Sequence, residues 1–264
     1  MPKKTVLRKR GRVTVDGHTV PVTVFFEKRS TARVSTGKDS VLLRVPARCS
    51  EKQLSEYKQW CSRWIKKQWQ SSERFRATYM PFDLTKCRKV STMDKEFCVR
   101  ISDSDRKMAR GAIEDNIISL QFPEGWPEAE RSPVGYRMIH DLLVRLYAVS
   151  FERRVRTLHQ GRFAKRIRSV TLRNMSSRWG SCSQHGELSF STRLLFAPKS
   201  VQDYVILHEL CHLDVLDHSD RFWKRVETYD PHYARKEQWL DDHGHLCDIK
   251  MRSQGTRYPV NKFP

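Results

Sequence analysis

The sequence predicts a mixed α+β protein, and three patterns in its 264 residues carry that prediction. Short runs of alternating apolar and polar residues, bounded by turn residues, indicate strands near the N-terminus and again near the middle. Segments in which apolar residues recur every three or four positions indicate a long amphipathic helix after each group of strands. Near the C-terminus, an apolar segment of helical pattern carries two histidines and a glutamate.

The N-terminal elements follow from the first two patterns. Residues 12–26 alternate around the turn Asp16-Gly17, and a second hairpin is expected from 32–36 and 41–46. From Ser50, which has the properties of an N-cap, a helix should extend to about Gln70.

The same order of elements recurs in the middle of the chain. Strands are expected at 97–101 and 117–122, followed by a helix from about Val134 to His159. We interpret the two segments as copies of a degenerate repeat that together form a small α+β module. Residues 72–96 are the predicted linker.

The C-terminal third should begin with a strand at 167–174, which we expect to pair as a hairpin with a strand at 187–190 across Gly186. A buried helix should follow from about Pro198. Shorter helices are predicted at about 219–228 and 231–243.

Composition narrows the classes of protein. No stretch approaches the roughly 18 apolar residues of a membrane span, and no apolar block of signal-peptide length follows the basic N-terminus. The seven cysteines are scattered and form no Cys-x-x-Cys pair, which argues against a disulfide framework. We therefore expect a soluble cytoplasmic protein that contacts no membrane.

Charge is distributed unevenly. The net charge is +20, and residues 1–72 hold 17 basic against 5 acidic side chains. Residues 198–250 hold 7 basic against 11 acidic side chains. The asymmetry suggests that a polyanion, nucleic acid above all, binds the basic N-terminal half, although such a face can also serve solubility alone.

The apolar helix carries the pattern His208-Glu209-Leu210-Cys211-His212. Residues four apart share a helix face, so the two histidines can bind one metal ion while Glu209 reaches the water that the ion activates. Two incidental histidines and a surface glutamate are the alternative. A carboxylate within a buried helical stretch needs a partner, which favours a metal site.

A hydrolytic zinc site takes three protein ligands and leaves one position open, so a third ligand is required. We expect His218, which needs the helix to end near Asp214 and the chain to reverse. No glycine is present for that reversal, so Asp214 or Asp217 should supply the turn. The alternative ligands are two downstream carboxylates, Glu227 and Glu237.

Hydrolysis at such a site needs a base and a donor for the oxyanion. Glu209 would take a proton from water and deliver it to the leaving amine. Four side chains are candidates for the oxyanion donor, and spacing does not choose between Arg178, Tyr229, His232 and Tyr233.

Several motifs resemble one known family. They are Arg178-Trp179-Gly180-Ser181-Cys182, Thr192-Arg193-Leu194-Leu195, Pro198, Asp203-Tyr204-Val205, the histidine motif itself, His218-Ser219, Phe222-Trp223 and Trp239-Leu240. Over about 165–243 the chain is similar to the YgjP-like metallopeptidases, relatives of the SprT-like zinc proteases. The N-terminal hairpin and helix are similar to that family through weaker motifs.

The resemblance implies a minimal zincin fold, zinc held by His208, His212 and His218, and Glu209 as the catalytic acid–base. It also implies that the third histidine is reached without the metzincin glycine. If the fold is zincin-like, strand 187–190 should be an edge strand above the cleft that pairs with an extended peptide.

Other residues of these motifs have a structural alternative. Arg178, Trp179 and Tyr233 are candidates for substrate binding, but Trp179, like Phe222 and Trp223, is also typical of packing around the motif helix. Cys182 and Cys211 are expected to be buried thiols, because nothing nearby activates a nucleophile.

Four regions are predicted: a basic strand and helix module at 1–72, a second strand and helix unit at 73–160, a zincin-like catalytic core at 161–250 and a tail at 251–264. The predicted activity is zinc-dependent hydrolysis of polypeptides. Two alternatives remain, a zinc-dependent nucleotide phosphohydrolase and a non-catalytic, zinc-stabilised nucleic-acid-binding protein.

Overall fold

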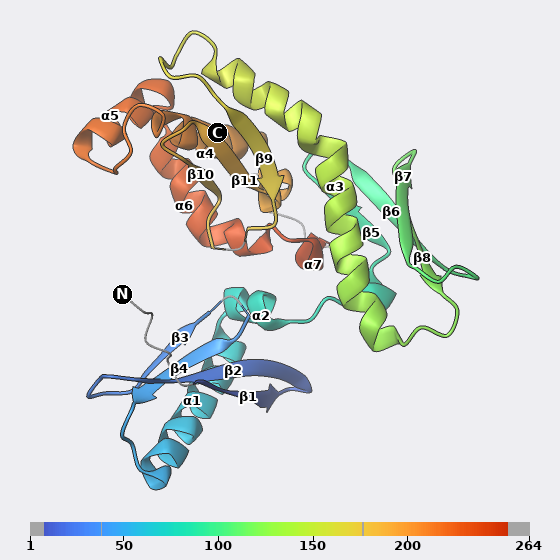
Figure 1. Ribbon diagram of the computed structural model, residues 1–264, viewed down its shortest axis with the longest axis vertical. Helices are drawn as coiled ribbons and strands as arrows, with labels where there is room; N and C mark the ends of the chain where they lie inside the picture. The colour runs from blue at the N-terminus through green and yellow to red at the C-terminus, as the bar shows by residue number, and fades with distance from the viewer. Residues whose placement is uncertain (1–7, 38, 176, 253–264) are drawn as a thin grey trace. The chain divides into compact units, whose positions relative to one another are not determined.

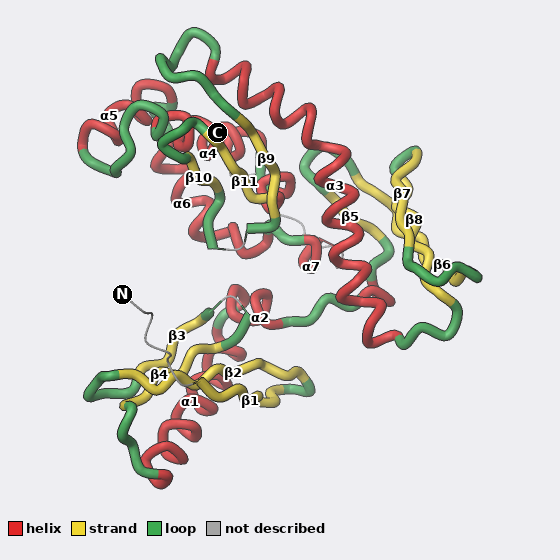
Figure 2. Tube along the Cα trace, in the orientation of Figure 1, coloured by secondary structure: helices red, strands yellow, loops and turns green. Residues whose placement is uncertain are grey.

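The computed structural model describes residues 8–37, 39–175 and 177–252, and it confirms a mixed α+β protein with helices and strands throughout (Figure 2). The chain divides into two compact units, of which the first ends at Pro81 and the second begins at Phe82. The four regions predicted from the sequence stay predictions. Apart from its first two residues, the expected tail at 251–264 lies outside the described residues.

The first unit is a four-stranded sheet with two helices. Its strands are β1 (Arg8–Val15), β2 (His18–Glu27), β3 (Arg33–Thr36) and β4 (Val41–Pro46), in the order β1-β2-β4-β3. The expected hairpins are confirmed: β1 pairs antiparallel with β2, and β3 with β4. Parallel pairing of β2 with β4 joins them.

The helices of this unit are α1 (Glu51–Ser71) and α2 (Glu73–Tyr79). A capping box between Ser50 and Gln53 starts α1 where the sequence predicts it. Alternate residues of the strands face α1 and α2, because side chains on a strand point to opposite faces in turn. The resulting core contains Val20, Val22, Val24, Leu43 and Val45 of the sheet, Cys61, Ile65 and Trp69 of α1, and Phe75 and Tyr79 of α2.

The second unit begins with the same arrangement. After a 3-10 turn, η1 (Leu84–Lys86), come β5 (Lys89–Ser91), β6 (Glu96–Ser104), β7 (Arg110–Glu114) and β8 (Ile117–Pro123), then α3 (Glu128–His159). The order β5-β6-β8-β7 and each pairing direction repeat those of the first sheet. The predicted repeat is therefore confirmed.

The two copies belong to different compact units. Two expectations about this region were wrong. The expected linker at 72–96 contains α2, η1 and β5. Helix α3 begins at Glu128 rather than near Val134, because Pro133 is accommodated in its second turn, where it removes only one backbone donor.

The rest of the second unit is built on a three-stranded sheet of β9 (Ser169–Arg173), β10 (Gly180–Cys182) and β11 (Glu187–Ser191). Its order is β10-β11-β9. The hairpin across Gly186 joins β10 to β11, whereas β9 pairs with β11 in parallel. The expected hairpin of 167–174 with 187–190 was therefore wrong, and β11 is the central strand rather than an edge.

Four helices complete this part of the chain. They are α4 (Lys199–Cys211), α5 (Asp220–Tyr229), α6 (Tyr233–His243) and α7 (Ile249–Arg252), with 3-10 turns η2 (Thr192–Phe196) and η3 (Gly244–Leu246). Helix α4 packs against β10, α5 and α6 pack against α4, and α7 contacts β5. Helix α3 packs against β7 and β8 at its start and against β9 and α4 further along (Figure 1). It therefore connects the second repeat copy to the β9–β11 sheet and to α4, the helix that carries the histidine motif.

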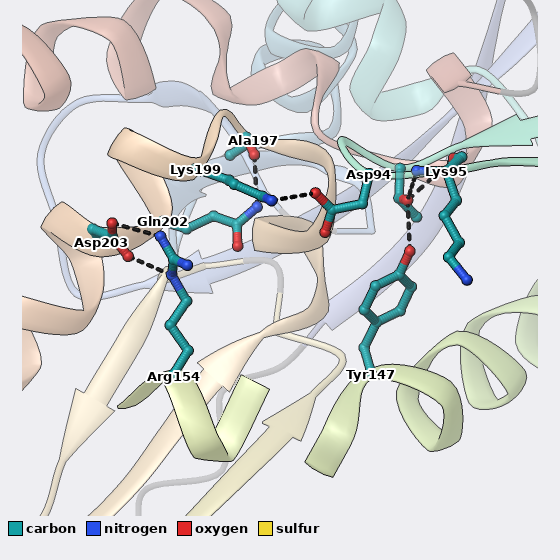
Figure 3. Close-up of polar contacts among 9 residues, drawn as sticks. Asp94, Lys95, Tyr147, Arg154, Ala197, Lys199, Gln202 and Asp203 are labelled. Carbon is teal, nitrogen blue, oxygen red and sulfur yellow. Dashed lines mark hydrogen bonds and ion pairs between the residues drawn. The ribbon is translucent and has the colours of Figure 1, made fainter. Parts of the chain in front are cut away.

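Polar contacts fix α4 in place (Figure 3). Arg154 of α3 donates two hydrogen bonds, of 2.5 and 2.6 Å, to the carboxylate of Asp203. Lys199 forms an ion pair of 3.0 Å with Asp94 in the β5–β6 turn. Gln202 donates to the carbonyl of Ala197 at 2.8 Å, just before the helix. These contacts anchor the first turns of α4 and so position the residues that follow.

Candidate metal centre

The motif helix α4 is apolar on nearly all sides. Nine of its 13 residues are buried, including Val205, Ile206, Leu207 and Leu210. A helix that is hydrophobic all round lies within the core, so it presents its few polar side chains at fixed positions. Glu209, with 6% exposure, is one of them.

The structure brings His208, His212 and His218 together. One ring nitrogen from each lies within 4.8 Å of the others. The Nε2 atoms of His208 and His218 are 3.2 Å apart, and the His212 and His218 rings are 4.7 Å apart. Of the rival ligands, Glu237 lies on α6 at the edge of the same cavity, but neither it nor Glu227 belongs to the cluster.

The chain reverses after α4 without a left-handed residue. Tight backbone bonds from Leu213 to Leu210 and from Asp214 to Cys211 close the turn. Neither Asp214 nor Asp217 has a positive φ, so the expectation that one of them supplies an unusual backbone angle was wrong. Asp214 instead pairs with Arg225 of α5.

This turn also orients a ligand. The Nδ1 atom of His212 lies 3.0 Å from the carbonyl oxygen of Val215, an acceptor that requires the proton on Nδ1. Its Nε2 is thereby left with a lone pair for a metal ion. Such a second contact is typical of histidine ligands, because it fixes the tautomer and the ring orientation.

Burial keeps two of these rings neutral. It lowers the pKa of His208 to about 3, helped by repulsion from the other two histidines, and it lowers the pKa of His212. Only neutral imidazole binds a metal ion, so the rings carry the required protonation state at neutral pH. Phe222, fully buried, stacks on the His212 ring at 4.4 Å, as expected of a packing residue.

Glu209 lies against the strand β10. A Cβ at Gly180 would come within 2.5 Å of its Cγ and 2.6 Å of its Oε1, so only glycine leaves room for this side chain. Burial raises the pKa of Glu209 to about 8, and the charge of Arg178 opposes that shift. Within the described part of the chain the carboxylate has no hydrogen bond or ion pair, which leaves it available to a bound molecule.

A cavity of about 460 Å³ opens beside these residues. Two of the three candidate substrate residues, Arg178 and Trp179, line it, whereas Tyr233 stacks on Trp223 and is not among the lining residues. The cavity is lined by Arg178, Trp179, Gly180, Ser181, Cys182, Tyr204, Val205, His208, Glu209, His212, Leu216, His218, Glu237, Leu240 and Asp241.

Trp179 also packs. Its ring lies 4.1 Å from the Arg193 guanidinium and directly against Gly244, where a Cβ would come within 2.6 Å. Burial raises the pKa of the Cys182 thiol to about 11 and that of Cys211 to about 12, so both stay protonated. Neither cysteine is a nucleophile in this setting, because the thiolate is the reactive form.

Sequence reasoning missed Tyr204 and Leu216. Tyr204 lies one helical turn before His208, with their rings 6.0 Å apart, and burial raises the pKa of its hydroxyl. The spacing of four residues is the signal that would have identified it. Leu216, 58% exposed, is an apolar side chain at the cavity rim, and no periodic pattern marks it because it lies in the turn.

The remaining oxyanion candidates point elsewhere. Tyr229 donates to the carbonyl of Arg162, and His232 is not among the lining residues. Arg178 is therefore the one of the four candidates that lines the cavity.

Three converging imidazoles, a buried carboxylate and an open cavity define the class of protein: it has a candidate metal centre beside an apolar helix. Residues 30–243 match the sequence model of the YgjP-like metallopeptidase domain. The chain belongs to the YgjP-like metallopeptidase family. No curated protein and no solved structure matches the chain. Among the described residues, no helix is long and apolar enough to cross a membrane.

Proposed function

We propose that this protein is a zinc-dependent metallopeptidase in which Glu209 is the general base. The observation that carries the proposal is the convergence of His208, His212 and His218 beside a buried carboxylate that forms no hydrogen bond or ion pair within the described chain. Helix α4, the β9–β11 sheet and helices α5 and α6 are then a minimal zincin-like core.

The donor set fits zinc. Nitrogen ligands lie about 2.05 Å from tetrahedral zinc, which separates two of them by about 3.3 Å. The Nε2 atoms of His208 and His218 are 3.2 Å apart, which matches the separation expected of two nitrogen ligands on one zinc ion. When bound, zinc would polarise the scissile carbonyl and lower the pKa of water.

Glu209 then has two tasks. Next to a cation its carboxylate is ionised, since an opposite charge favours the charged form. It takes a proton from the attacking water and later delivers it to the leaving amine. Arg178 lines the same cavity and is the donor we assign to the developing oxyanion.

The substrate would be an extended polypeptide paired with β10, which replaces β11 as the edge strand of this sheet. The bonds from Ser191 to Trp179 and from Ser183 to Glu187 direct the backbone groups of Ser181 toward β11. Those of Gly180 and Cys182 therefore face outward and are available to a peptide.

The experiment is a product analysis with zinc-loaded protein, unfolded polypeptide and nucleoside triphosphates. The expected result is peptide fragments that are lost in Glu209→Gln, which excludes a contaminating protease. Release of phosphate or pyrophosphate from intact nucleotides would instead assign the nucleotide phosphohydrolase. Zinc that stabilises the fold, with no product from either substrate, would assign the non-catalytic alternative.

Substrate pairing has its own test. Cys182→Pro removes an outward N–H but none of the sheet's hydrogen bonds, because proline is tolerated on an edge strand at such a position. We expect zinc content to be unchanged and peptide turnover to fall at least tenfold. Unchanged turnover would exclude main-chain pairing with β10. Ser189→Pro would break the central strand and cannot test this point.

A further inference from the structure

The open face of the first sheet is strongly basic. Because Val20, Val22 and Val24 of β2 face the core, their neighbours in sequence and register face away from it. This face, which we call the arginine face, carries five arginines against the single carboxylate of Glu27. The arginines are Arg8, Arg10 and Arg12 of β1, Arg33 of β3 and Arg44 of β4.

One row across all four strands combines charge with an aromatic ring. In the register of the strands, Arg8 of β1 lies opposite Phe25 of β2, Phe25 lies opposite Arg44 of β4, and Arg44 lies opposite Arg33 of β3. Phe25 is half-buried, and the Arg44 guanidinium lies 5.6 Å from its ring centre. The row therefore places an aromatic surface between cations on a sheet.

Most of this charge is not neutralised within the protein. Arg44 is 3.3 Å from Glu27, which also pairs with Arg29. Arg8, Arg10, Arg12 and Arg33 are exposed, and none forms an ion pair with a carboxylate in the described part of the chain. Four guanidinium groups on one face are thus available to an external anion.

The second copy of the repeat lacks these features, although its strands have the same order. Its open-face rows are Cys98–Ile117–Glu114, Arg100–Ser119–Ala112 and Ser102–Gln121–Arg110. They contain no aromatic residue and mix the signs of charge. The arginine face is therefore not a requirement of the repeat fold, which can form without it.

We infer that the arginine face binds single-stranded nucleic acid, with phosphates on the arginines of β1 and β3 and a base stacked on Phe25. Guanidinium groups bind phosphate in a bidentate manner, and an aromatic ring stacks on any base that is not already stacked in a duplex. Hydroxyl groups between the arginines, such as those of Thr23 and Ser35, suit contacts to the phosphate and sugar. Binding here requires no activity at the proposed zinc site.

The test is fluorescence anisotropy of a labelled 20-nucleotide oligothymidylate and of a duplex of equal length, over a range of salt concentrations. The wild type should bind the single strand more tightly than the duplex. In Arg10→Ser/Arg12→Ser, the slope of the logarithm of the binding constant against the logarithm of the salt concentration should be shallower by about 1.4, since each phosphate contact on a single strand contributes about 0.7 to this slope. At 0.1 M salt, the double variant should bind about 25-fold more weakly.

Arg100→Ser/Arg110→Ser is the matched control, because it removes two arginines from the open face of the other sheet. It should leave the affinity for the single strand unchanged. Phe25→Val, which keeps a β-branched residue in the strand, should weaken binding about tenfold with the same salt slope. Equal urea midpoints show that each variant folds.

Several results would overturn the inference. They are equal losses in the two double variants, an affinity unchanged by Phe25→Val, or tighter binding of the duplex. Binding to phosphatidylserine vesicles in the absence of any affinity for oligothymidylate would assign the arginine face to a membrane surface instead.

Discussion

Replacement of Glu209 by glutamine should stabilise the metal-free protein at neutral pH. Burial raises the pKa of this carboxyl group from its ordinary value of 4.5 to about 8 in the folded chain. A group whose pKa is raised on folding contributes stability below the unfolded value, and that contribution is lost as the pH rises toward the folded value. The wild type therefore loses stability between about pH 4.5 and 8, whereas the glutamine variant does not.

The size of the effect follows from the two values. Between pH 5 and 7.5, the free energy of unfolding of Glu209→Gln should rise by about 3 kcal/mol relative to the wild type, at about 1.4 kcal/mol per pKa unit. Urea unfolding in the presence of a chelator measures this difference at each pH. Glu227→Gln, an exposed change on α5, should stay within about 0.5 kcal/mol at both pH values.

Zinc should abolish the difference in pH dependence, because a cation beside the carboxylate favours its charged form. A difference between wild type and Glu209→Gln that is independent of pH in the chelated protein would refute the reasoning. It would mean that the carboxylate is solvated or paired in the folded state.

Two further predictions concern packing around α4. Gly180→Ala should lower kcat/KM at least tenfold without loss of zinc, because the new Cβ displaces Glu209. The control is Gly11→Ala, whose new Cβ meets no atom within 4 Å and which should leave kcat/KM unchanged. Full activity in Gly180→Ala would contradict this prediction. Arg154→Gln should lower the free energy of unfolding by about 1 kcal/mol, since it removes a bidentate contact between α3 and Asp203 of α4. The control is Arg156→Gln on the same helix, which should lower the free energy of unfolding by less than about 0.5 kcal/mol. Equal urea midpoints for these two variants would show that the contact of Arg154 with Asp203 does not anchor α4.

The histidine cluster was predictable because its chemistry is local. His208 and His212 share a helix face through their spacing alone, and the position of His218 follows once the helix ends. The way in which the chain turns was not predictable, because the tight backbone hydrogen bonds after Leu210 need no residue with a positive φ, and so no residue type marks the turn.

The sheet beside the cluster shows what sequence patterns cannot provide. The alternation of apolar and polar residues predicts where in the sequence β9 and β11 lie. Their pairing partners and the direction of pairing depend instead on contacts between distant segments. The edge strand β10 is only three residues long, too short for a periodic signal. The role of Gly180 was hidden for a similar reason, since it depends on its approach to Glu209 in three dimensions.

The repeat was visible in the sequence because each copy has the same order of strands and helix. Its boundaries were less accurate, since the helix expected from about Val134 begins at Glu128 in the structure. The division after Pro81 was also not evident, because α2 belongs with the first core through Phe75 and Tyr79.

The central claim is that a metal ion and Glu209 act together on a peptide bond. The most direct measurement is kcat per bound zinc for the wild type, Glu209→Gln and Glu237→Gln, a second carboxylate lining the same cavity. All three should bind one zinc ion, and Glu209→Gln should lose about 10³-fold in kcat while Glu237→Gln stays within tenfold of the wild type. Retained turnover in Glu209→Gln, with a full complement of zinc, would contradict the account.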